Sequence, residues 1–200
     1  MLSRFAVLFS TLAFAALTCT GIADPSPGSD PPGKLGIWVG RWTFSGQIYE
    51  TRYSHAHADT GVADCTWTAS KGYVICDYFS DNPPHDDLSV ISYSSSAKAY
   101  THAGIHKDRP PSSEKLTQNG NIWITSSDIH DKGQTLVLRT TFVFLTLDKQ
   151  TTKVQVSADK GRTWTTIIQV TAVKAANPDL RRVVANVPAR PYREALSRLF

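Results

Sequence analysis

The residues from Trp42 to Ile48 alternate in polarity, and this alternation constrains the fold more than any other feature of the chain. One side of a β-strand here would carry Trp42, Phe44, Gly46 and Ile48, and the polar residues between them would take the other side. A period of two residues is typical of a strand with one buried face. We therefore expect the folded domain to begin with a strand over roughly Arg41–Tyr53.

Similar short apolar segments recur along the chain, with turn residues between them and no long helical pattern. Asn119-Gly120 is a strong hairpin signal, and Gln134–Leu147 is expected to be the longest strand. Asp81–Asp87, which contains two prolines, is expected to be a turn, and Ser127–Gly133 a polar connection. About eight to ten strands in this arrangement predict an all-β, antiparallel up-and-down β-barrel with a short C-terminal helix or tail.

The overall composition suits one packed domain. In 200 residues, 19% are charged and 10% aromatic, which excludes a disordered chain. The formal net charge is +4, and much of the excess lies near the C-terminus. Nucleic-acid binding would require a basic face with interleaved aromatic residues, so we expect no nucleic-acid partner.

The first residues have the pattern of a secretion signal. Arg4 precedes an apolar stretch, Phe5–Leu17, and small residues follow at Gly21 and Ala23. We expect cleavage after Ala23 and a secreted or periplasmic protein, because the apolar stretch is too short for a stable membrane span. Acylation of Cys19 is an alternative, but the residues before it match a lipoprotein signal poorly.

The chain then divides into three parts by composition. Residues 24–34 are rich in Pro, Gly and Ser and predict an extended linker. Residues 35–174 hold the predicted strands and form the barrel domain. Residues 175–200 are a basic tail without alternation, in which Arg190–Phe200 has the spacing of a short helix.

Two cysteines remain after removal of the signal. When the hairpin between the second and third strands is centred on Ser70-Lys71, Cys65 lies directly opposite Cys76, which predicts a cross-strand disulfide in an oxidising compartment. The same register places Asp64 opposite Asp77. Like charges in such positions are unfavourable unless they are exposed, belong to a polar site, or the register is shifted.

Gly40-Arg41-Trp42, a Gly-x-Trp motif on the first strand, resembles the lipocalin (calycin) superfamily, and in particular secreted bacterial lipocalin-like proteins that open with a Leu-rich turn and this motif. The resemblance implies a barrel in which the Trp closes one end and the strands enclose a cavity. The expected ligand is a small hydrophobic or amphipathic molecule, with no cofactor. The residues that we expect to line the cavity are Trp42, Phe44, Phe142, Phe144 and Arg139.

Four histidines are weaker candidates for a metal or haem pocket: His55 and His57, two residues apart, and His102 and His106, four apart on one face of a strand. No standard catalytic motif is present in the sequence. Two alternatives to a ligand binder stay open. One is an enzyme that uses Asp64, Asp77 or the histidines in a polar cavity, and the other is a structural envelope protein with a filled barrel. A binder requires a cavity of about 300 Å³.

The segment from Ser157 to Trp164 matches the Ser-x-Asp-x-Gly-x-x-Trp pattern of propeller hairpins. A propeller requires repeated blades, and one copy in this length excludes it. We therefore interpret the motif as a structural turn in which Asp159 caps backbone amides and Gly161 adopts a positive φ.

Overall fold

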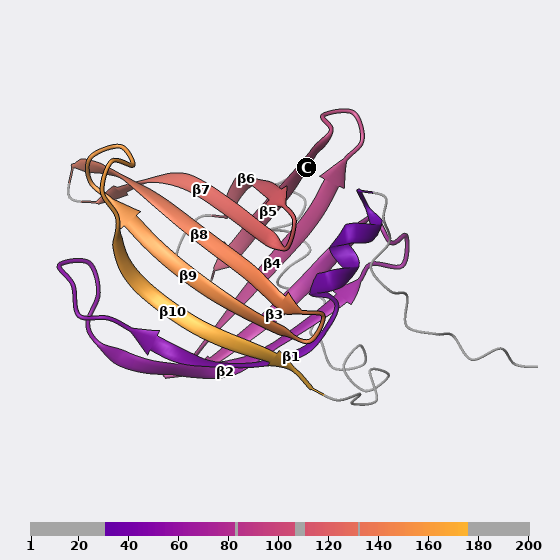
Figure 1. Cartoon of the computed structure of the whole chain (residues 1–200), viewed down its shortest axis with the longest axis horizontal. Coiled ribbons are helices and arrows are strands. Elements are labelled where there is room, and N and C mark those ends of the chain that lie inside the picture. The colour runs from indigo at the N-terminus through magenta and orange to yellow at the C-terminus, as the bar shows by residue number, and fades with distance from the viewer. Residues whose placement is uncertain (1–30, 83, 107–110, 132, 176–200) are drawn as a thin grey trace, which may run out of the picture.

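The computed structural model of the chain is a closed antiparallel barrel of ten strands (Figure 1). The structure describes residues 31–82, 84–106, 111–131 and 133–175. The predicted fold class is therefore confirmed, whereas the signal peptide, Cys19 and the basic tail beyond residue 175 lie outside the described residues. The elements are a 3₁₀-helix, η1 (Gly33–Trp38), and the strands β1 (Gly40–Ile48), β2 (His57–Trp67), β3 (Tyr73–Asp81), β4 (Pro84–Ser94), β5 (Ala99–His106), β6 (Ser112–Asn119), β7 (Ile122–Asp131), β8 (Gln134–Thr146), β9 (Lys149–Ser157) and β10 (Thr165–Lys174).

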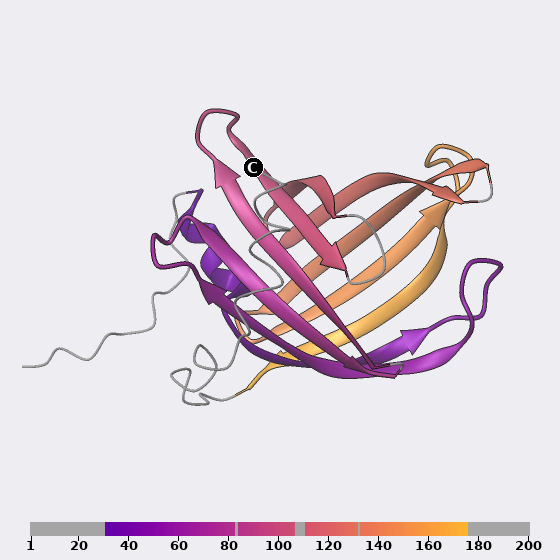
Figure 2. The ribbon, with the colours of Figure 1, turned by 180° about the vertical axis from the view of Figure 1, so that it is seen from behind.

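Each strand pairs with the next one along the chain, and β10 returns to pair with β1. This last ladder runs from Trp42 opposite Lys174 to Ile48 opposite Ile168. Among the described strands, closure leaves no edge strand, and this removes the template that an open sheet offers for aggregation. Seen from behind, β3 to β5 form the wall opposite β8 to β10 (Figure 2).

The helix η1 closes one end of the barrel, and the connections at 49–56 and 157–164 lie at the other (Figure 1). Side chains three residues apart stack on one side of a 3₁₀-helix, so Leu35 and Trp38 point the same way, and both are buried. Trp42 Nε1 donates a hydrogen bond to the carbonyl oxygen of Trp38 at 2.8 Å. The tryptophan of the Gly-x-Trp motif therefore holds the helix in place.

Trp38 is the centre of an aromatic cluster at this closed end. Its ring meets those of Trp123, Phe142 and Phe144 edge to face, with centroid separations of 5.9, 4.8 and 4.9 Å. Edge-to-face packing is a favourable arrangement of aromatic rings. Because the partners come from β7 and β8, the cluster joins the start of the domain to strands about a hundred residues later.

The register of β2 and β3 agrees with the prediction. Cys65 lies opposite Cys76, and the two form a disulfide. Asp64 lies opposite Asp77 on the outer face, where Arg41 Nη1 approaches Asp64 Oδ2 at 3.5 Å. Burial raises the pKa of Asp77, and the nearby carboxylates of Asp86 and Asp64 raise it further.

Four expected boundaries differ from the structure. Asp81–Asp87 is not a turn throughout: β4 already begins at Pro84, because proline is tolerated at the first residue of a strand, where no ladder amide is lost. Most of Ser127–Gly133 extends β7 to Asp131 rather than forming a loop. The first strand ends at Ile48, and η1 begins inside the segment predicted to be a linker.

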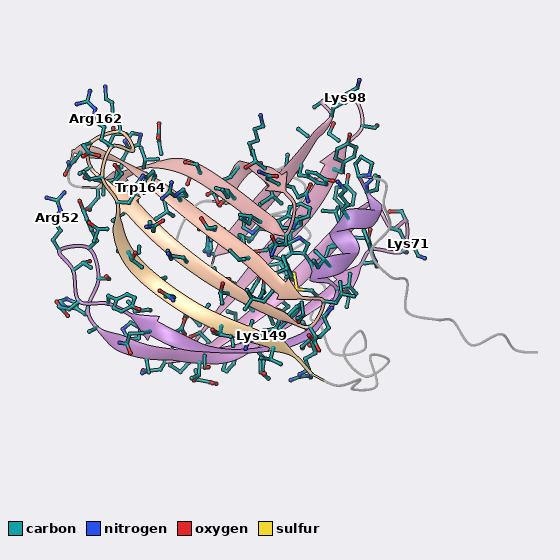
Figure 3. All side chains as sticks on the ribbon, in the orientation of Figure 1. Arg52, Lys71, Lys98, Lys149, Arg162 and Trp164 are labelled. Carbon is teal, nitrogen blue, oxygen red and sulfur yellow. A yellow bond between two sulfur atoms is a disulfide. The ribbon has the colours of Figure 1, made fainter. Side chains whose placement is uncertain are left out.

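The turn before Trp164 has the predicted structural role. Asp159 accepts hydrogen bonds from the backbone amide and the hydroxyl of Thr163 at 2.8 and 2.6 Å, and these bonds lower its pKa strongly. Gly161 has φ +86°. Figure 3 shows Trp164 and Arg162 at the end of the barrel opposite η1.

Removal of the disulfide tests the contribution of the Cys65–Cys76 link. The double substitution Cys65→Ala/Cys76→Ala is expected to lower the free energy of unfolding by about 2–4 kcal/mol, because the disulfide restricts the conformational entropy of the unfolded chain. Urea denaturation of the oxidised protein and the double variant measures the difference, and the reduced wild type should move towards the variant. Equal midpoints for the oxidised protein and the variant would contradict the expectation.

Truncation of Trp38 tests the closed end. Trp38→Ala is expected to lower the free energy of unfolding by about 3–5 kcal/mol, because a large ring buried among three others leaves a void. The control Leu147→Ala removes a side chain that is 58% exposed and should change stability by no more than about 0.5 kcal/mol. Thermal and urea unfolding compare the two variants. A Trp38 variant as stable as the control would show that η1 is not needed for closure.

Candidate functional site

A cavity of about 290 Å³ lies inside the barrel, between the aromatic cluster and the opposite end. Its size is at the lower end for small-molecule sites. Side chains from β1 to β5 and from β8 to β10 line it, together with Trp38 of η1. Because inward and outward positions alternate along every strand, each strand supplies a few residues at spacings of two.

One wall of the cavity is largely apolar. It is formed by β1 and by β8 to β10, and its lining residues are Trp42, Phe44, Thr140, Phe142, Gln150, Thr152, Val154, Ile168, Val170 and Ala172. Phe44 lies against Gly61 of β2: a Cβ at Gly61 would be 2.5 Å from the Phe44 ring and 2.1 Å from the carbonyl oxygen of Phe79. Only glycine therefore lets this ring fit against the backbone.

The facing wall is polar. It is formed mainly by β2 to β5, and its polar lining residues are Asp59, Tyr78, Ser80, His85, Asp87, Ser89, His102 and His106. The strand pairings bring them together, since Tyr78 lies opposite Asp87 and Ser80 opposite His85. The cavity therefore presents an apolar surface to one side of a guest and a hydrogen-bonding surface to the other.

Asp87 is the centre of this polar wall. Its Oδ1 accepts a hydrogen bond from Nδ1 of His106 at 2.7 Å, and its Oδ2 lies 3.8 Å from Nε2 of His85. The Asp87 side chain is 28% exposed and that of His106 is 18% exposed. A carboxylate that bonds one ring nitrogen fixes the tautomer and orientation of an imidazole. Beside them, Ser80 Oγ donates to Asp59 Oδ1 at 2.6 Å.

A second polar network runs through Ser89. His102 Nε2 is 3.1 Å from Ser89 Oγ, and Ser89 also hydrogen-bonds to the phenol of Tyr78. Burial raises the pKa of Tyr78 to about 12; the hydrogen bond from Ser89 opposes this rise, and the negative charge of Asp87 adds to it. Burial also lowers the pKa of His102, against the opposing effect of Glu114. At neutral pH the phenol keeps its proton and the imidazole of His102 is uncharged.

Of the five residues predicted from the sequence to line the cavity, three do so and two lie elsewhere. Trp42, Phe44 and Phe142 line the cavity. Phe144 is buried in the closed end, in edge contact with Trp38. Arg139 lies instead on the outer face, where its guanidinium carbon is 3.8 Å from the centroid of the Trp164 ring. It is three positions before Phe142 on β8, and an odd offset along a strand places two side chains on opposite faces.

The histidines are divided in the same way. His102 and His106 both point into the cavity from β5, whereas His55 lies near Glu50 with its side chain 98% exposed. His57 begins β2, and its Nδ1 contacts the carbonyl oxygen of His55. Across the ranges that the structure describes, no three His, Cys, Asp or Glu side chains are placed to hold a metal ion. The same ranges contain no helix with the length and apolar character needed to cross a bilayer.

Sequence reasoning missed the centre of the polar wall. Once Pro84 is read as the first residue of a strand, the spacing of His85, Asp87 and Ser89 by two places all three on one face. Asp59 lies near the start of β2, two residues before Gly61, and so shares the inward face of that strand. The alternation that places these residues on one face was therefore present in the sequence, but the two prolines led us to predict a turn there.

No protein-family model matches the sequence, and no curated protein matches it either. Among solved structures, the S-type phycobiliprotein lyase CPES from Guillardia theta has a similar fold, with a TM-score of 0.52 and 11% sequence identity, over 72% of this chain and 92% of the lyase chain. The fold is calycin-like. At this identity the likeness concerns the fold alone, and it agrees with the resemblance carried by Gly40-Arg41-Trp42.

The lowered pKa of His102 predicts a pH dependence of stability. Below a pH of about 6.5, His102 binds a proton in the unfolded chain but not in the folded protein. The free energy of unfolding should therefore fall as the pH falls from 7 to 5. His102→Gln removes this contribution and should flatten that part of the profile, as measured by urea denaturation at several pH values. His55→Gln is the matched control for the loss of one histidine. An unchanged profile in the His102 variant would contradict a buried, neutral imidazole.

Proposed function

We propose that the protein binds a small hydrophobic or amphipathic molecule inside the barrel, in a secreted or periplasmic setting. The observation that carries this proposal is the cavity of about 290 Å³ with one apolar and one polar wall. Sites for small molecules are concave, mostly apolar and furnished with a few polar groups that fix orientation. The presence of an interior cavity also argues against a barrel that is filled and purely structural.

The proposed compartment is supported by the Cys65–Cys76 disulfide. Both cysteines are buried, and such bonds persist in oxidising compartments and are rare in the cytosol. The sequence pattern of a signal peptide before Ala23 is the second support. The barrel fold that the chain shares with a phycobiliprotein lyase is compatible with binding of a small molecule inside the barrel.

An enzyme with a polar cavity is a second candidate, and the Asp87–His106 pair favours it. An imidazole oriented by a carboxylate is a common general base. The carboxylates named from the sequence for this role, Asp64 and Asp77, belong to the outer face of β2 and β3. Any such chemistry would therefore rest on the residues of the polar wall, on a molecule already bound in the cavity.

Filling the cavity tests the proposed binding site. Val170→Trp puts a large ring into the apolar wall and is expected to weaken binding of a neutral probe, N-phenylnaphthylamine, by about tenfold or more, because ligand and ring compete for one space. Fluorescence titration of the probe measures the affinity, and far-UV circular dichroism checks the fold.

The control Val173→Trp places the same ring on the outer side of the same strand, at a residue that is 46% exposed. It should bind the probe like the wild type. Equal affinity in both variants would place the probe outside the barrel, and no binding to the wild type would contradict the proposed function.

A further inference from the structure

The outward-facing side chains of β4 and β5 are buried. The residues of these two strands that line the cavity include Asp87, Ser89, His102 and His106. Because side chains alternate between the two faces of a strand, the residues at the alternate positions point outward. Five of these outward residues are at most 9% exposed: Leu88, Val90, Ser92, Ala103 and Ile105.

The apolar members of this group form one continuous surface. Leu88 lies opposite Ile105, and Val90 lies opposite Ala103, in the ladder between β4 and β5. On the other side of β4, Ile75 of β3 lies opposite Val90. Side chains that are directly opposite on one face of a sheet are about 5 Å apart and contact each other. These five residues therefore make an apolar cluster on the outside of the barrel, which we call the outer patch.

The burial of the outer patch differs from that of other outward apolar residues. Val173 of β10 is 46% exposed and Leu145 of β8 is 52% exposed, whereas Leu88 in the outer patch is 3% exposed. Neighbouring strands alone leave an outward side chain open to solvent on its free side. Figure 2 looks onto this face, and no helix or strand of the described residues lies across it. A segment outside the described ranges is needed to account for the burial.

We propose that the C-terminal segment, residues 176–200, docks on the outer patch and covers it. The segment is long and carries the apolar residues Leu180, Val183, Val184, Val187, Tyr192, Leu196, Leu199 and Phe200. The other segments outside the described ranges suit the patch less well. Residues 24–30 have no large apolar side chain, residues 107–110 are mostly charged, and residues 1–23 are the predicted signal peptide.

The described chain ends within reach of the outer patch. The backbone amide of Ala175 donates a hydrogen bond to the carbonyl oxygen of Arg41 at 2.7 Å, so the chain leaves the barrel beside β1. In the sheet, β2 and β3 separate β1 from β4, and three strand spacings amount to about 15 Å. An extended chain advances about 3.3 Å per residue, so roughly five residues cross this distance. The remainder of the segment is available to lie along the patch.

The charge of the surface between β1 and β4 favours the same segment. Asp64 and Asp77 lie opposite each other on the outer face, and the carboxylates of Asp86 and Asp64 both act on Asp77. The segment carries more basic than acidic side chains: Arg181, Arg182, Arg190, Arg193 and Arg198 against Asp179 and Glu194. Burial is the largest cause of the raised pKa of Asp77. This burial of an outward carboxylate agrees with a segment that crosses β3.

The docked segment lies directly behind the polar wall of the cavity. Leu88 alternates along β4 with Asp87 and Ser89, which point inward. Contacts on the outer patch therefore support the backbone from which the polar wall projects. The docking does not depend on what the cavity binds, so its test requires no ligand.

Trypsin digestion of the full chain under native conditions tests the docking. Cleavage after Arg181, Arg182, Arg193 and Arg198 is expected to be about tenfold or more slower than in a free peptide of residues 176–200, because a docked segment is cleaved only after it detaches. Arg190 is left out because Pro191 follows it. Mass spectrometry identifies the products over time. Cleavage of the protein at the rate of the free peptide would overturn the proposal.

Substitutions on the barrel locate the docking surface. Leu88→Gln puts a polar amide into the outer patch and is expected to speed cleavage of the segment several-fold, with the fold checked by far-UV circular dichroism. Val90→Thr, which nearly keeps the shape of the side chain, is a milder second variant and should accelerate cleavage about twofold. The matched control Leu145→Gln changes an outward leucine that is 52% exposed and should leave the rate unchanged. Equal rates in the patch variants and the control would overturn the assignment to the outer patch.

Discussion

The pairing of β10 with β1 is the constraint on which the rest of the structure depends. Once the sheet closes, the position of a residue along its strand decides whether its side chain enters the interior or faces out. Every group of the polar wall and every ring of the apolar wall is inside because it occupies one of the alternate, inward-facing positions of its strand. A shift of one residue at closure would exchange the two faces of the adjoining strands.

Closure alone does not produce a cavity, because ten strands with large inward side chains could fill the space. Here the large rings are concentrated at one end, where Trp38, Trp123 and Phe144 are almost fully buried. Further along, the inward positions hold smaller residues such as Gly61 and Val170. The cavity therefore results from an uneven distribution of side-chain volume along the barrel axis. Large rings fill the end at η1, and smaller side chains leave space in the rest of the barrel.

Much of the fold could be predicted because it depends on local signals. The alternation from Trp42 to Ile48 and the hairpin that aligns Cys65 with Cys76 act over a few residues, and both are observed. The site was less accessible to prediction. Asp87 and His106 are brought together by the register of β4 and β5, which the two prolines before β4 obscured, and Arg139 was assigned to the interior although its parity on β8 directs it outward.

The two walls of the cavity come from different parts of the chain. The polar wall belongs to one continuous stretch, from β2 to β5, and the apolar wall to β1 and the stretch from β8 to β10. Under the proposed function, the contacts to the polar part and to the apolar part of a ligand would come from separate segments that meet only through the closed sheet. In such a binder, substitutions in β2 to β5 would change the polar contacts while the apolar wall stays the same, so specificity and affinity would evolve separately.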